Sequence, residues 1–497
     1  MNLTAQNWLA LMPLMVPAAA ACLIPIASLD KDQDTVKSVR AAMFGMAMLG
    51  LGVSFFYLTK IWASGQNVSF SGLKMDRLGQ FSGIFVTVAA MMALLQLWDH
   101  LHHEGWVKGE TLSLLLFSVV GMMLFASTTN LLMMFLGLEL LSLPLYVLTA
   151  IVRFREESVE GGMKYFITGA VASSCFLMGT VLLYGLTGTL ELDGIGRAIQ
   201  ASGADPLILV GTALLLMGLL FKISAVPFHQ WTPDVYEAAP QPISGFMSVA
   251  TKGVAVIALM RAFPGAMGLH TATGQRVGMA LAVLAAASMI IGNLSALPQT
   301  NVKRMLAYSS ISHAGYLLLG FVAGTAEAYT GVLFYLVIYL AMNMAAFGML
   351  TAFGLVGEHT RFEDLRGLGW KRPILGIAVV ITMLSLAGIP PTGGFFGKYF
   401  IFKELVKTGH VGLAVLGVTA SLVSVYYYLR VVIALFLEQP SEAQAREAAE
   451  KPEVQSFLST TTVLLCAAII LAGGFFQTFL VDGFAARALK EGIETLR

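Results

Sequence analysis

The chain has 497 residues, of which 57% are hydrophobic and only 12% are charged, and its mean hydropathy is +0.78. A soluble domain carries about 25% charged residues, so this composition indicates an integral membrane protein. The formal net charge of +1 provides neither a basic surface for nucleic acid nor an acidic tail. The three cysteines, Cys22, Cys175 and Cys466, form no CxxC pair of the kind that binds iron–sulfur clusters or zinc.

Apolar runs of membrane-spanning length follow one another along almost the whole chain. Because the hydrocarbon core of a bilayer takes about 20 apolar residues per helix, these runs predict about fourteen transmembrane helices. Their expected ranges are 8–28, 39–61, 78–98, 111–128, 131–152, 163–187, 206–230, 242–263, 277–297, 304–324, 329–356, 372–402, 410–437 and 456–480. The predicted fold class is an all-α polytopic membrane protein, with a surface helix expected in the polar segment 438–455.

Two of the predicted helices contain strong interruptions. Helix 7 carries Pro227, and helix 12 carries Pro390 and Pro391 followed by Gly393 and Gly394. A proline inside a helix removes a backbone hydrogen bond and kinks the axis, although prolines that serve only packing are common in membranes. Two discontinuous helices in the two halves of a chain are typical of inverted repeats with an ion site between them. The sequence therefore predicts that helices 7 and 12 are broken.

Ionisable residues lie inside the predicted spans. Among them are Glu139 in helix 5, Lys222 in helix 7, Lys252 in helix 8 and Lys398 after the break in helix 12. Each such charge costs roughly 2.5–3.5 kcal/mol at the centre of a membrane helix, so we expect these side chains to have polar partners or a function. Charges that only fix helix pairing are the alternative.

Glu139 and Lys222 share a local pattern. Glu139 precedes Pro144 by five residues, and Lys222 precedes Pro227 by five. Each proline frees a backbone carbonyl beside the charged residue, and freed carbonyls attract water. We therefore expect Pro144 and Pro227 to break or kink their helices beside hydrated charges.

Four other polar residues permit two interpretations each. Lys164, near a helix end, either joins a proton relay or extends to the membrane interface. His229 either relays protons or caps a half-helix, and His313 is either a relay or a hydrogen-bonded core histidine. Arg430 is expected to be a structural or interfacial cation.

These residue types suit proton transfer. A desolvated lysine loses its proton and regains it when a carboxylate approaches, so a Glu–Lys pair can act as a switch. The chain has no GxSxG, GxxxxGK[ST] or GxGxxG motif, so neither a nucleotide site nor a redox centre is expected in it. We expect the energy for transport to arrive from another subunit.

Five stretches of the sequence carry a family likeness. They are LGLELLSLPLY (136–146), GGMKYFITGAVASS (161–174), LLFKISAVPFHQWTPDVYEAAPQPISGFMSVATKG (219–253), NVKRMLAYSSISHAGY (301–316) and LAGIPPTGGFFGKYFIF (386–402). In these stretches the chain resembles the antiporter-like subunits of respiratory complex I, the proton-translocating NADH–quinone oxidoreductase.

The resemblance implies fourteen helices with two inverted five-helix repeats. The implied division places helices 1–3 in residues 1–110, the first repeat with helices 4–8 in 111–263, the second repeat with helices 9–13 in 277–437, and a surface segment with helix 14 in 438–497.

The resemblance also implies roles for individual residues. Glu139 and Lys222 would form the coupling pair, Lys252 would be the central relay, and Lys398 would be the exit or linking lysine. The implied accessory relay residues are Lys164, His229 and His313.

The family likeness implies a subunit of a translocase in the bacterial inner membrane, with other membrane subunits and lipids as its partners and no nucleic acid. FMN, iron–sulfur clusters and quinone are expected in partner subunits, and no cofactor or metal in this chain. Within the family the chain is similar to subunit N, because no long lateral helix is expected after the last span and Lys398 stands where subunit M carries glutamate. A subunit of an Mrp-type sodium/proton antiporter is the alternative.

Lysine and arginine are spread almost evenly over the loops and only weakly favour termini outside the cytoplasm.

Overall fold

The computed structural model describes residues 5–27, 36–70, 72–104, 109–202, 205–267, 272–355, 357, 359–440 and 456–490. The first part of the chain forms α1 (Ala5–Ala27), α2 (Val36–Ser64), the antiparallel strands β1 (Val68–Phe70) and β2 (Leu73–Met75), α3 (Arg77–Glu104), α4 (Gly109–Ser127), α5 (Leu131–Thr149), α6 (Glu156–Thr187), α7 (Leu192–Ser202), α8 (Pro206–Ile223), α9 (Trp231–Ala238), α10 (Gln241–Phe246), the π-helical η1 (Met247–Thr251) and α11 (Lys252–Met267). The rest forms α12 (Ala272–Ala296), α13 (Val302–Ala323), α14 (Ala326–Ala352), the 3₁₀ turn η2 (Phe362–Leu365), α15 (Leu368–Lys371), α16 (Pro373–Ala387), α17 (Gly393–Lys407), α18 (Val411–Phe436), α20 (Phe457–Phe475), α21 (Gln477–Leu480), the π-helical η3 (Val481–Ala485) and α22 (Ala486–Lys490).

The number of helices agrees with the prediction from the sequence. Within the described residues, 13 helices are long and apolar enough to cross a membrane. The predicted helix 12 is not among these 13, because it is split into α16 and α17. Together they account for the predicted fourteen crossings and confirm an all-α polytopic fold.

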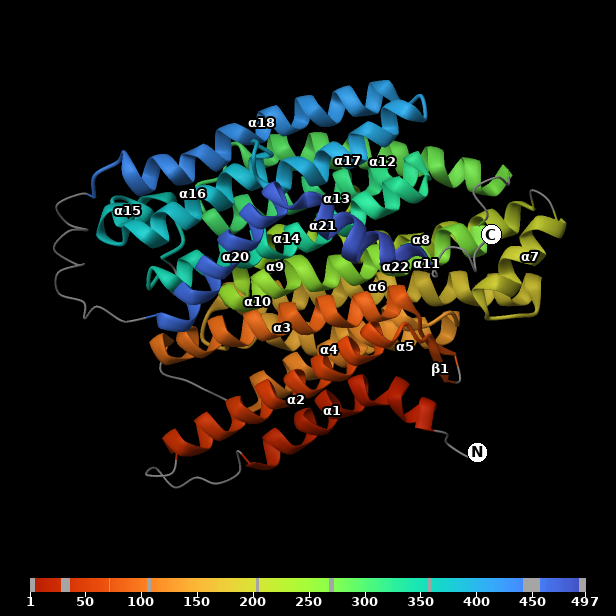
Figure 1. Ribbon diagram of the computed structural model, residues 1–497, viewed down its shortest axis with the longest axis horizontal. Coiled ribbons are helices and arrows are strands. Elements are labelled where there is room, and N and C mark those ends of the chain that lie inside the picture. Colours follow the sequence, from red (N-terminus) through yellow and green to blue (C-terminus); the bar gives the residue numbers. More distant parts are fainter. Residues whose placement is uncertain are drawn as a thin grey trace.

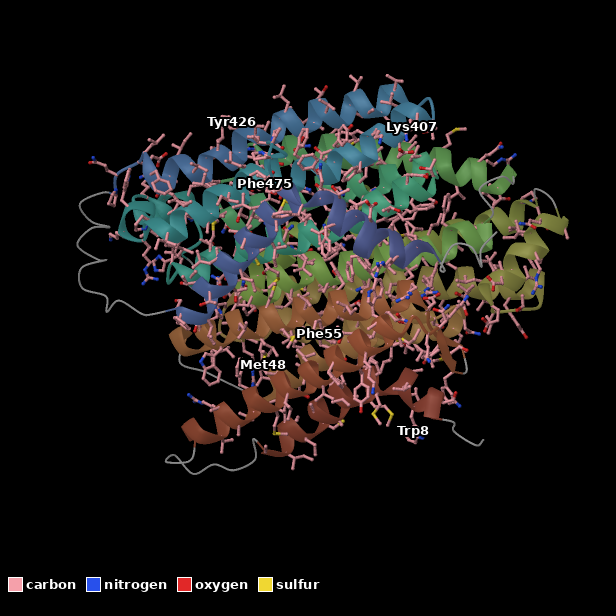
Figure 2. The ribbon with its side chains drawn as sticks, in the orientation of Figure 1. Trp8, Met48, Phe55, Lys407, Tyr426 and Phe475 are labelled. Atoms are coloured by element: carbon pink, nitrogen blue, oxygen red, sulfur yellow. The ribbon has the colours of Figure 1, made fainter. Side chains whose placement is uncertain are left out.

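The helices run side by side, with α1 and α2 at one edge of the molecule and α18 at the opposite edge (Figure 1). Burial is highest in the middle of this array. In the 18-residue apolar window of each span, 100% of the residues are buried for 241–263, 94% for α14 and 89% for α13, but only 33% for α1. The apolar outer side chains include Trp8, Tyr426 and Phe475, which are labelled in Figure 2. This distribution is that of a membrane protein whose interior helices are enclosed by helices available to lipid or partner subunits.

Polar side chains fix the starts of three important helices. Asn130 caps α5 by accepting hydrogen bonds from two backbone amides, Asn301 caps α13 in the same way, and Asp205 caps α8. Such caps satisfy amides that have no partner inside the helix. Asn130 and Asn301 also each form an isolated β-bridge, to Glu191 and to Arg361. The two asparagines therefore occupy equivalent places, each before a helix and beside the segment that follows the next long helix.

The break in helix 7 is larger than a kink. The sequence predicts one helix over 206–230, but α8 ends at Ile223 and the chain becomes helical again at Trp231 in α9. Ser224 terminates α8 in the left-handed conformation with φ +63°, and its amide donates to the carbonyls of the last turn. Pro227 thus lies in a non-helical connection, which confirms the predicted break, and the single expected range 206–230 is replaced by α8 and α9.

The other predicted breaks have different outcomes. α16 ends at Ala387 and α17 begins at Gly393, so Pro390 and Pro391 do interrupt helix 12. Pro144 lies inside the continuous helix α5, so the predicted break there is wrong. The missing amide of a proline removes only one hydrogen bond, and the turns on either side of Pro144 keep theirs. The surface helix predicted at 438–455 lies mostly outside the described residues.

The helices α5 and α13 begin on opposite faces of the molecule. Near the C-terminal end of α5, the Thr149 carbonyl accepts a hydrogen bond from Ser158 at the start of α6. On that same face, Lys164 of α6 and Arg304 of α13 bind one carboxylate, that of Asp234. Because Arg304 lies in the first turn of α13, α13 starts where α5 ends. This geometry is that of two inverted segments, each with one broken helix.

Candidate proton-transfer site

Lys222 lies in the last turn of α8 and is only 3% exposed. Its ammonium group is 5.0 Å from the ring centre of Tyr165, 5.3 Å from that of Tyr146 and 5.6 Å from that of Phe221. No hydrogen-bond acceptor for its Nζ lies among the described residues. We call these three rings the ring enclosure of Lys222. Ring faces attract a cation without accepting its protons in conventional hydrogen bonds.

Glu139 lies on α5, seven residues before Tyr146 of the ring enclosure. Its side chain is half-buried, and one carboxylate oxygen, Oε1, is buried without a hydrogen-bond partner in the described part of the chain. Glu139 and Lys222 lie within electrostatic reach of each other but form no ion pair within 4.0 Å. The structure therefore brings the two residues to the same region but does not join them by direct contact.

Lys252 follows the π-helical segment η1 and is completely buried. Its ammonium group donates to the carbonyl oxygen of Ser310 at 2.8 Å and also to the hydroxyl of the same residue. The ring of Tyr236 lies 6.0 Å away. Single π-helical turns inside helices occur frequently at functional sites. Here the π-helical turn immediately precedes the buried lysine.

Lys398 reaches back across the second helix break. Its ammonium group donates to the carbonyls of Leu386 and Ala387, at the C-terminal end of α16, at 3.0 and 3.4 Å. It also donates to Ser421 Oγ at 2.8 Å, and the Tyr316 ring lies 4.8 Å away. The C-terminal end of a helix carries partial negative charge and unpaired carbonyls, so it is a suitable place for a buried cation.

His313 is held between two phenols inside the protein. Its Nδ1 lies 2.5 Å from the Tyr335 hydroxyl, and its Nε2 lies 3.0 Å from the Tyr428 hydroxyl. A neutral imidazole donates at one nitrogen and accepts at the other, so this arrangement satisfies either tautomer. His313 is therefore both a hydrogen-bonded core residue and a group that can exchange protons on two sides.

Side-chain contacts, together with one turn of α13 between Ser310 and His313, connect three of the buried lysines. This contact series runs through Lys222, Tyr165, Trp231, Tyr236, Lys252, Ser310, His313, Tyr316 and Lys398. The ring centres are 4.5 Å apart between Tyr165 and Trp231, and 6.1 Å apart between Trp231 and Tyr236. Ser310 and His313 are one turn apart on α13. The hydroxyls of Tyr165, Tyr236 and Tyr316 are buried without hydrogen-bond partners in the described structure, so each can bond to water.

The remaining predicted residues have distinct surroundings. His229 is half-buried in the connection after α8, and its Nδ1 has no hydrogen-bond partner among the described residues. Arg430 donates to the carbonyls of Leu297 and Gln299 and covers the Phe362 ring at 4.2 Å. Arg430 thus binds the chain that leaves α12 and has a structural environment.

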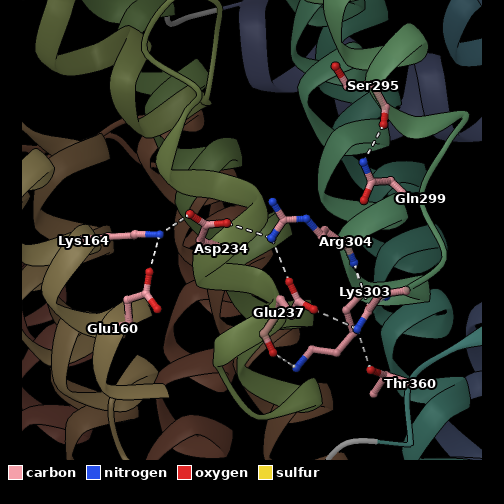
Figure 3. A network of polar contacts seen from close by, with 10 residues as sticks. Glu160, Lys164, Asp234, Glu237, Ser295, Gln299, Lys303, Arg304 and Thr360 are labelled. Carbon is pink, nitrogen blue, oxygen red and sulfur yellow. Dashed lines mark hydrogen bonds and ion pairs between the residues drawn. The ribbon is translucent and has the colours of Figure 1, made fainter. Parts of the chain in front are cut away.

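Lys164 belongs to a network of ion pairs near the surface, shown in Figure 3. It contacts Glu160 at 2.6 Å and Asp234 at 2.7 Å, and its side chain is 45% exposed. Asp234 also pairs with Arg304 at 2.7 Å, and Arg304 pairs with Glu237 at 2.8 Å. Lys164 is thus an ion-pair partner on the outside of α6, apart from the contact series between the buried lysines.

Sequence reasoning missed a buried ion pair at the end of helix 8. Arg261 binds Asp76 through both guanidinium nitrogens, at 2.8 and 2.5 Å, and donates to the Ala126 carbonyl at 2.7 Å. Burial raises the pKa of the Asp76 carboxyl, whereas the Arg261 guanidinium and the Gly79 amide lower it. Together these two partners outweigh burial, so the pKa of Asp76 lies below its ordinary value. A charged residue inside a predicted span was the available signal for Arg261; its partner could not be deduced.

The tyrosines were also missed, because aromatic residues in apolar helices are indistinguishable from ordinary core residues in sequence.

With respect to metals, the described residues contain no group of three or more His, Cys, Asp or Glu side chains that could hold an ion. The three cysteines are free.

The family model for the transmembrane domain of NADH:quinone oxidoreductase and Mrp antiporters matches residues 128–424 of the chain. The NADH-quinone oxidoreductase subunit N of Salinibacter ruber is 39% identical over 451 residues, covering 89% of each chain. The chain belongs to the subunit N family of NADH-quinone oxidoreductase. The subunit N of Moorella thermoacetica is 43% identical over 376 residues, covering 76% of this chain and 78% of the relative.

Solved structures agree with this family assignment. A chain of respiratory complex I from Thermus thermophilus with bound aureothin is 33% identical, with a TM-score of 0.78 over 95% of this chain and 99% of that one. A chain of the Mrp complex from Dietzia has a TM-score of 0.82 over 99% of each chain, but its identity is 21%. At that identity the likeness shows the fold alone, so the subunit N assignment is better supported than an Mrp assignment.

Proposed function

We propose that this chain is a proton-translocating membrane subunit of a bacterial NADH–quinone oxidoreductase. NADH oxidation and quinone reduction would take place in partner subunits that carry FMN, iron–sulfur clusters and the quinone site. This chain would use the released energy to move protons across the inner membrane. Its partners would be neighbouring antiporter-like and smaller membrane subunits.

The observation that carries the proposal is the contact series between the buried lysines. Lys222, Lys252 and Lys398 are each at most 3% exposed, and they lie beside helix interruptions or a π-helical turn. Three buried cations are costly in a membrane protein unless polar groups or hydration compensate for them. Of the groups that connect them, the phenols, the serine and the histidine can donate and accept protons, whereas the Trp231 indole can only donate.

The local surroundings support the roles that we propose for these residues. Lys222 has ring faces around it and no hydrogen-bond acceptor, so its proton would depend most on the charge of Glu139. Lys252, bonded to Ser310, would be the central relay, and His313 would pass protons toward Lys398. Lys398, bonded to helix-end carbonyls, would be the exit or linking lysine.

The proposed organisation divides the chain into two inverted five-helix repeats, in residues 111–263 and 277–437. The equivalent asparagine caps at Asn130 and Asn301 and the equivalent helix breaks support this division. Each repeat would form one half-channel, and Lys252 would lie where the two meet.

The decisive experiment measures redox and transport separately in the assembled complex. In membrane vesicles energised with NADH, Lys222→Ala and Glu139→Gln should lower proton pumping about tenfold or more, the scale at which proton-transfer groups act. Native gels would verify assembly, and electron transfer to an artificial acceptor would verify the redox subunits. Normal pumping by assembled variants would favour a scaffold whose charges only set helix pairing. Cation/proton exchange by a purified complex without flavin or iron–sulfur subunits would favour the Mrp alternative.

A further inference from the structure

The half-helix α9 is held in its first turn by charges from two other helices. Asp234 of α9 accepts from Lys164 of α6 at 2.7 Å through one carboxylate oxygen and from Arg304 of α13 at 2.7 Å through the other. Figure 3 shows this carboxylate between its two cationic partners. At the C-terminal end of α9, Lys303 donates to the carbonyls of Glu237 and Ala239, both at 2.6 Å.

The same turn of α9 reaches the ring enclosure of Lys222. Trp231, the first residue of α9, lies three positions before Asp234 and therefore on the same side of the helix. Its indole stacks on Tyr165 with ring centres 4.5 Å apart and an interplanar angle of 6°, and its Nε1 donates to the Phe221 carbonyl at 3.2 Å.

Two neighbouring residues of α6 contact these same two residues of α9. Lys164 pairs with Asp234, and the next residue, Tyr165, stacks on Trp231 and faces Lys222. Loss of the ion pair would allow α9 to turn or tilt against α6. Such a movement displaces Trp231, and with it the ring on which the Lys222 ammonium depends.

We propose that Asp234 is a positioning residue for Lys222: with Lys164 and Arg304 it fixes α9, and through Trp231 and Tyr165 it sets the ring enclosure. This inference rests on the proposed function, and it gives Lys164 a role as a clamp in place of a proton relay. It also makes α13, which carries Ser310 and His313, part of what holds the surroundings of Lys222 in place.

The test uses the complete complex with variants that separate charge from proton exchange. Asp234→Asn keeps the shape of the side chain but removes its charge, so proton pumping per NADH should fall about fivefold, the effect of losing a modest interaction energy. Asp234→Glu should restore most of the pumping. Lys164→Arg keeps the ion pair but cannot release its proton, so it should pump nearly as the wild type does. Glu160→Gln removes a charge that pairs with Lys164 and, in the described part of the chain, not with α9; it is the matched control and should also pump normally.

A structural readout tests the clamp without transport. Hydrogen exchange of the amides in residues 231–238 should accelerate in Asp234→Asn and remain unchanged in Lys164→Arg and Glu160→Gln. Unchanged exchange in Asp234→Asn, or wild-type pumping by it, would overturn the clamp. Loss of pumping in Lys164→Arg with normal exchange would restore Lys164 as a relay and equally overturn it. Normal pumping by Lys222→Ala would instead contradict the proposed function, whereas the exchange measurement would still report on α9.

Discussion

The ammonium group of Lys222 lies 5.3 Å from the centre of the Tyr146 ring, and that ring occupies the space beside Gly169. A Cβ at Gly169 would come within 2.0 Å of the Tyr146 hydroxyl oxygen and 2.7 Å of the adjoining ring carbon. The glycine in α6 thus makes room for one wall of the ring enclosure. The close fit connects a backbone feature of one helix to the environment of a lysine on another.

Gly169→Ala should therefore disturb Lys222 without altering any polar group. Overpacking costs about 1–3 kcal/mol, and the Tyr146 ring must shift from its position beside the ammonium group to make room for the methyl group. We expect proton pumping to fall severalfold, a loss comparable to that of a cation–π contact of about 0.5–2 kcal/mol. NADH-driven pumping in vesicles would measure it, with assembly followed on native gels.

Gly185→Ala is the matched control for this substitution. Gly185 lies on the same helix, α6, and no atom lies within 4 Å of a Cβ placed there. It should assemble and pump as the wild type does. Equal pumping by the two alanine variants would show that Tyr146 does not influence Lys222.

The second broken helix leads to a different prediction, because Lys398 has oxygen ligands. Ser421→Ala removes the hydroxyl that accepts from Lys398 at 2.8 Å but leaves the carbonyls of Leu386 and Ala387. A hydrogen bond to a charged group is worth about 1.5–3 kcal/mol, so the cationic form of Lys398 loses part of its stabilisation. Pumping should slow while assembly is retained, and Ser421→Thr, which keeps a hydroxyl, should recover most of the rate. Identical rates for the alanine and threonine variants would contradict the role of Ser421.

The sequence identifies the buried charges of this site but not their surroundings. Lys222, Lys252 and Lys398 are recognisable because an ionisable residue inside an apolar span has a high cost. Tyr165 and Tyr236 carry no such signal, since a tyrosine in an apolar helix is an ordinary core residue. Their position between the lysines depends on how distant helices pack, and no local pattern contains that information.

The two broken helices also differ in how much of each break the sequence predicts. The two prolines and two glycines of 390–394 exclude a continuous helix on their own, and the break is where the sequence predicts it. At Pro227 the sequence predicts a break but not where the helix ends: α8 ends four residues earlier at Ile223, with Ser224 in the left-handed conformation. A serine with positive φ is maintained by tertiary contacts that local propensity does not reveal. The continuity of α5 through Pro144 is likewise a consequence of packing.

A prediction about stability concerns the buried pair of Asp76 and Arg261, which are 1% and 4% exposed. Asp76→Asn would leave the guanidinium buried without a counter-charge, and breaking such a pair costs about 3–5 kcal/mol. The purified complex should therefore unfold at lower temperature or lose this subunit. The exposed residue Asp193, in the first turn of α7, provides the control, and Asp193→Asn should leave stability unchanged.

The pH dependence of that pair has a definite sign. The pKa of Asp76 is lower in the folded protein than its ordinary value, so the folded state favours the carboxylate. Its contribution to stability is present in full above the unfolded pKa of about 3.9 and is lost as the pH falls through the folded pKa. The stability difference between wild type and Asp76→Asn should therefore be constant near neutral pH and shrink only in strong acid. A difference that shrinks between pH 8 and pH 5 would contradict this account.

His313 provides a test of the contact series at its centre. His313→Leu removes both ring nitrogens and leaves the Tyr335 and Tyr428 hydroxyls without this partner, at a cost of about 1–3 kcal/mol for each buried group. It also interrupts the connection between Ser310 and Tyr316, so proton pumping should fall about tenfold or more.

His313→Gln distinguishes proton transfer from packing at this position. A glutamine side chain can both donate and accept a hydrogen bond, but it does not titrate between pH 5 and 8. If His313 carries protons, His313→Gln should assemble well and still pump poorly; if His313 only supports the tyrosines, it should pump almost normally. The exposed His410 before α18 supplies the control, because His410→Gln changes the same residue type at an exposed position and should leave pumping intact.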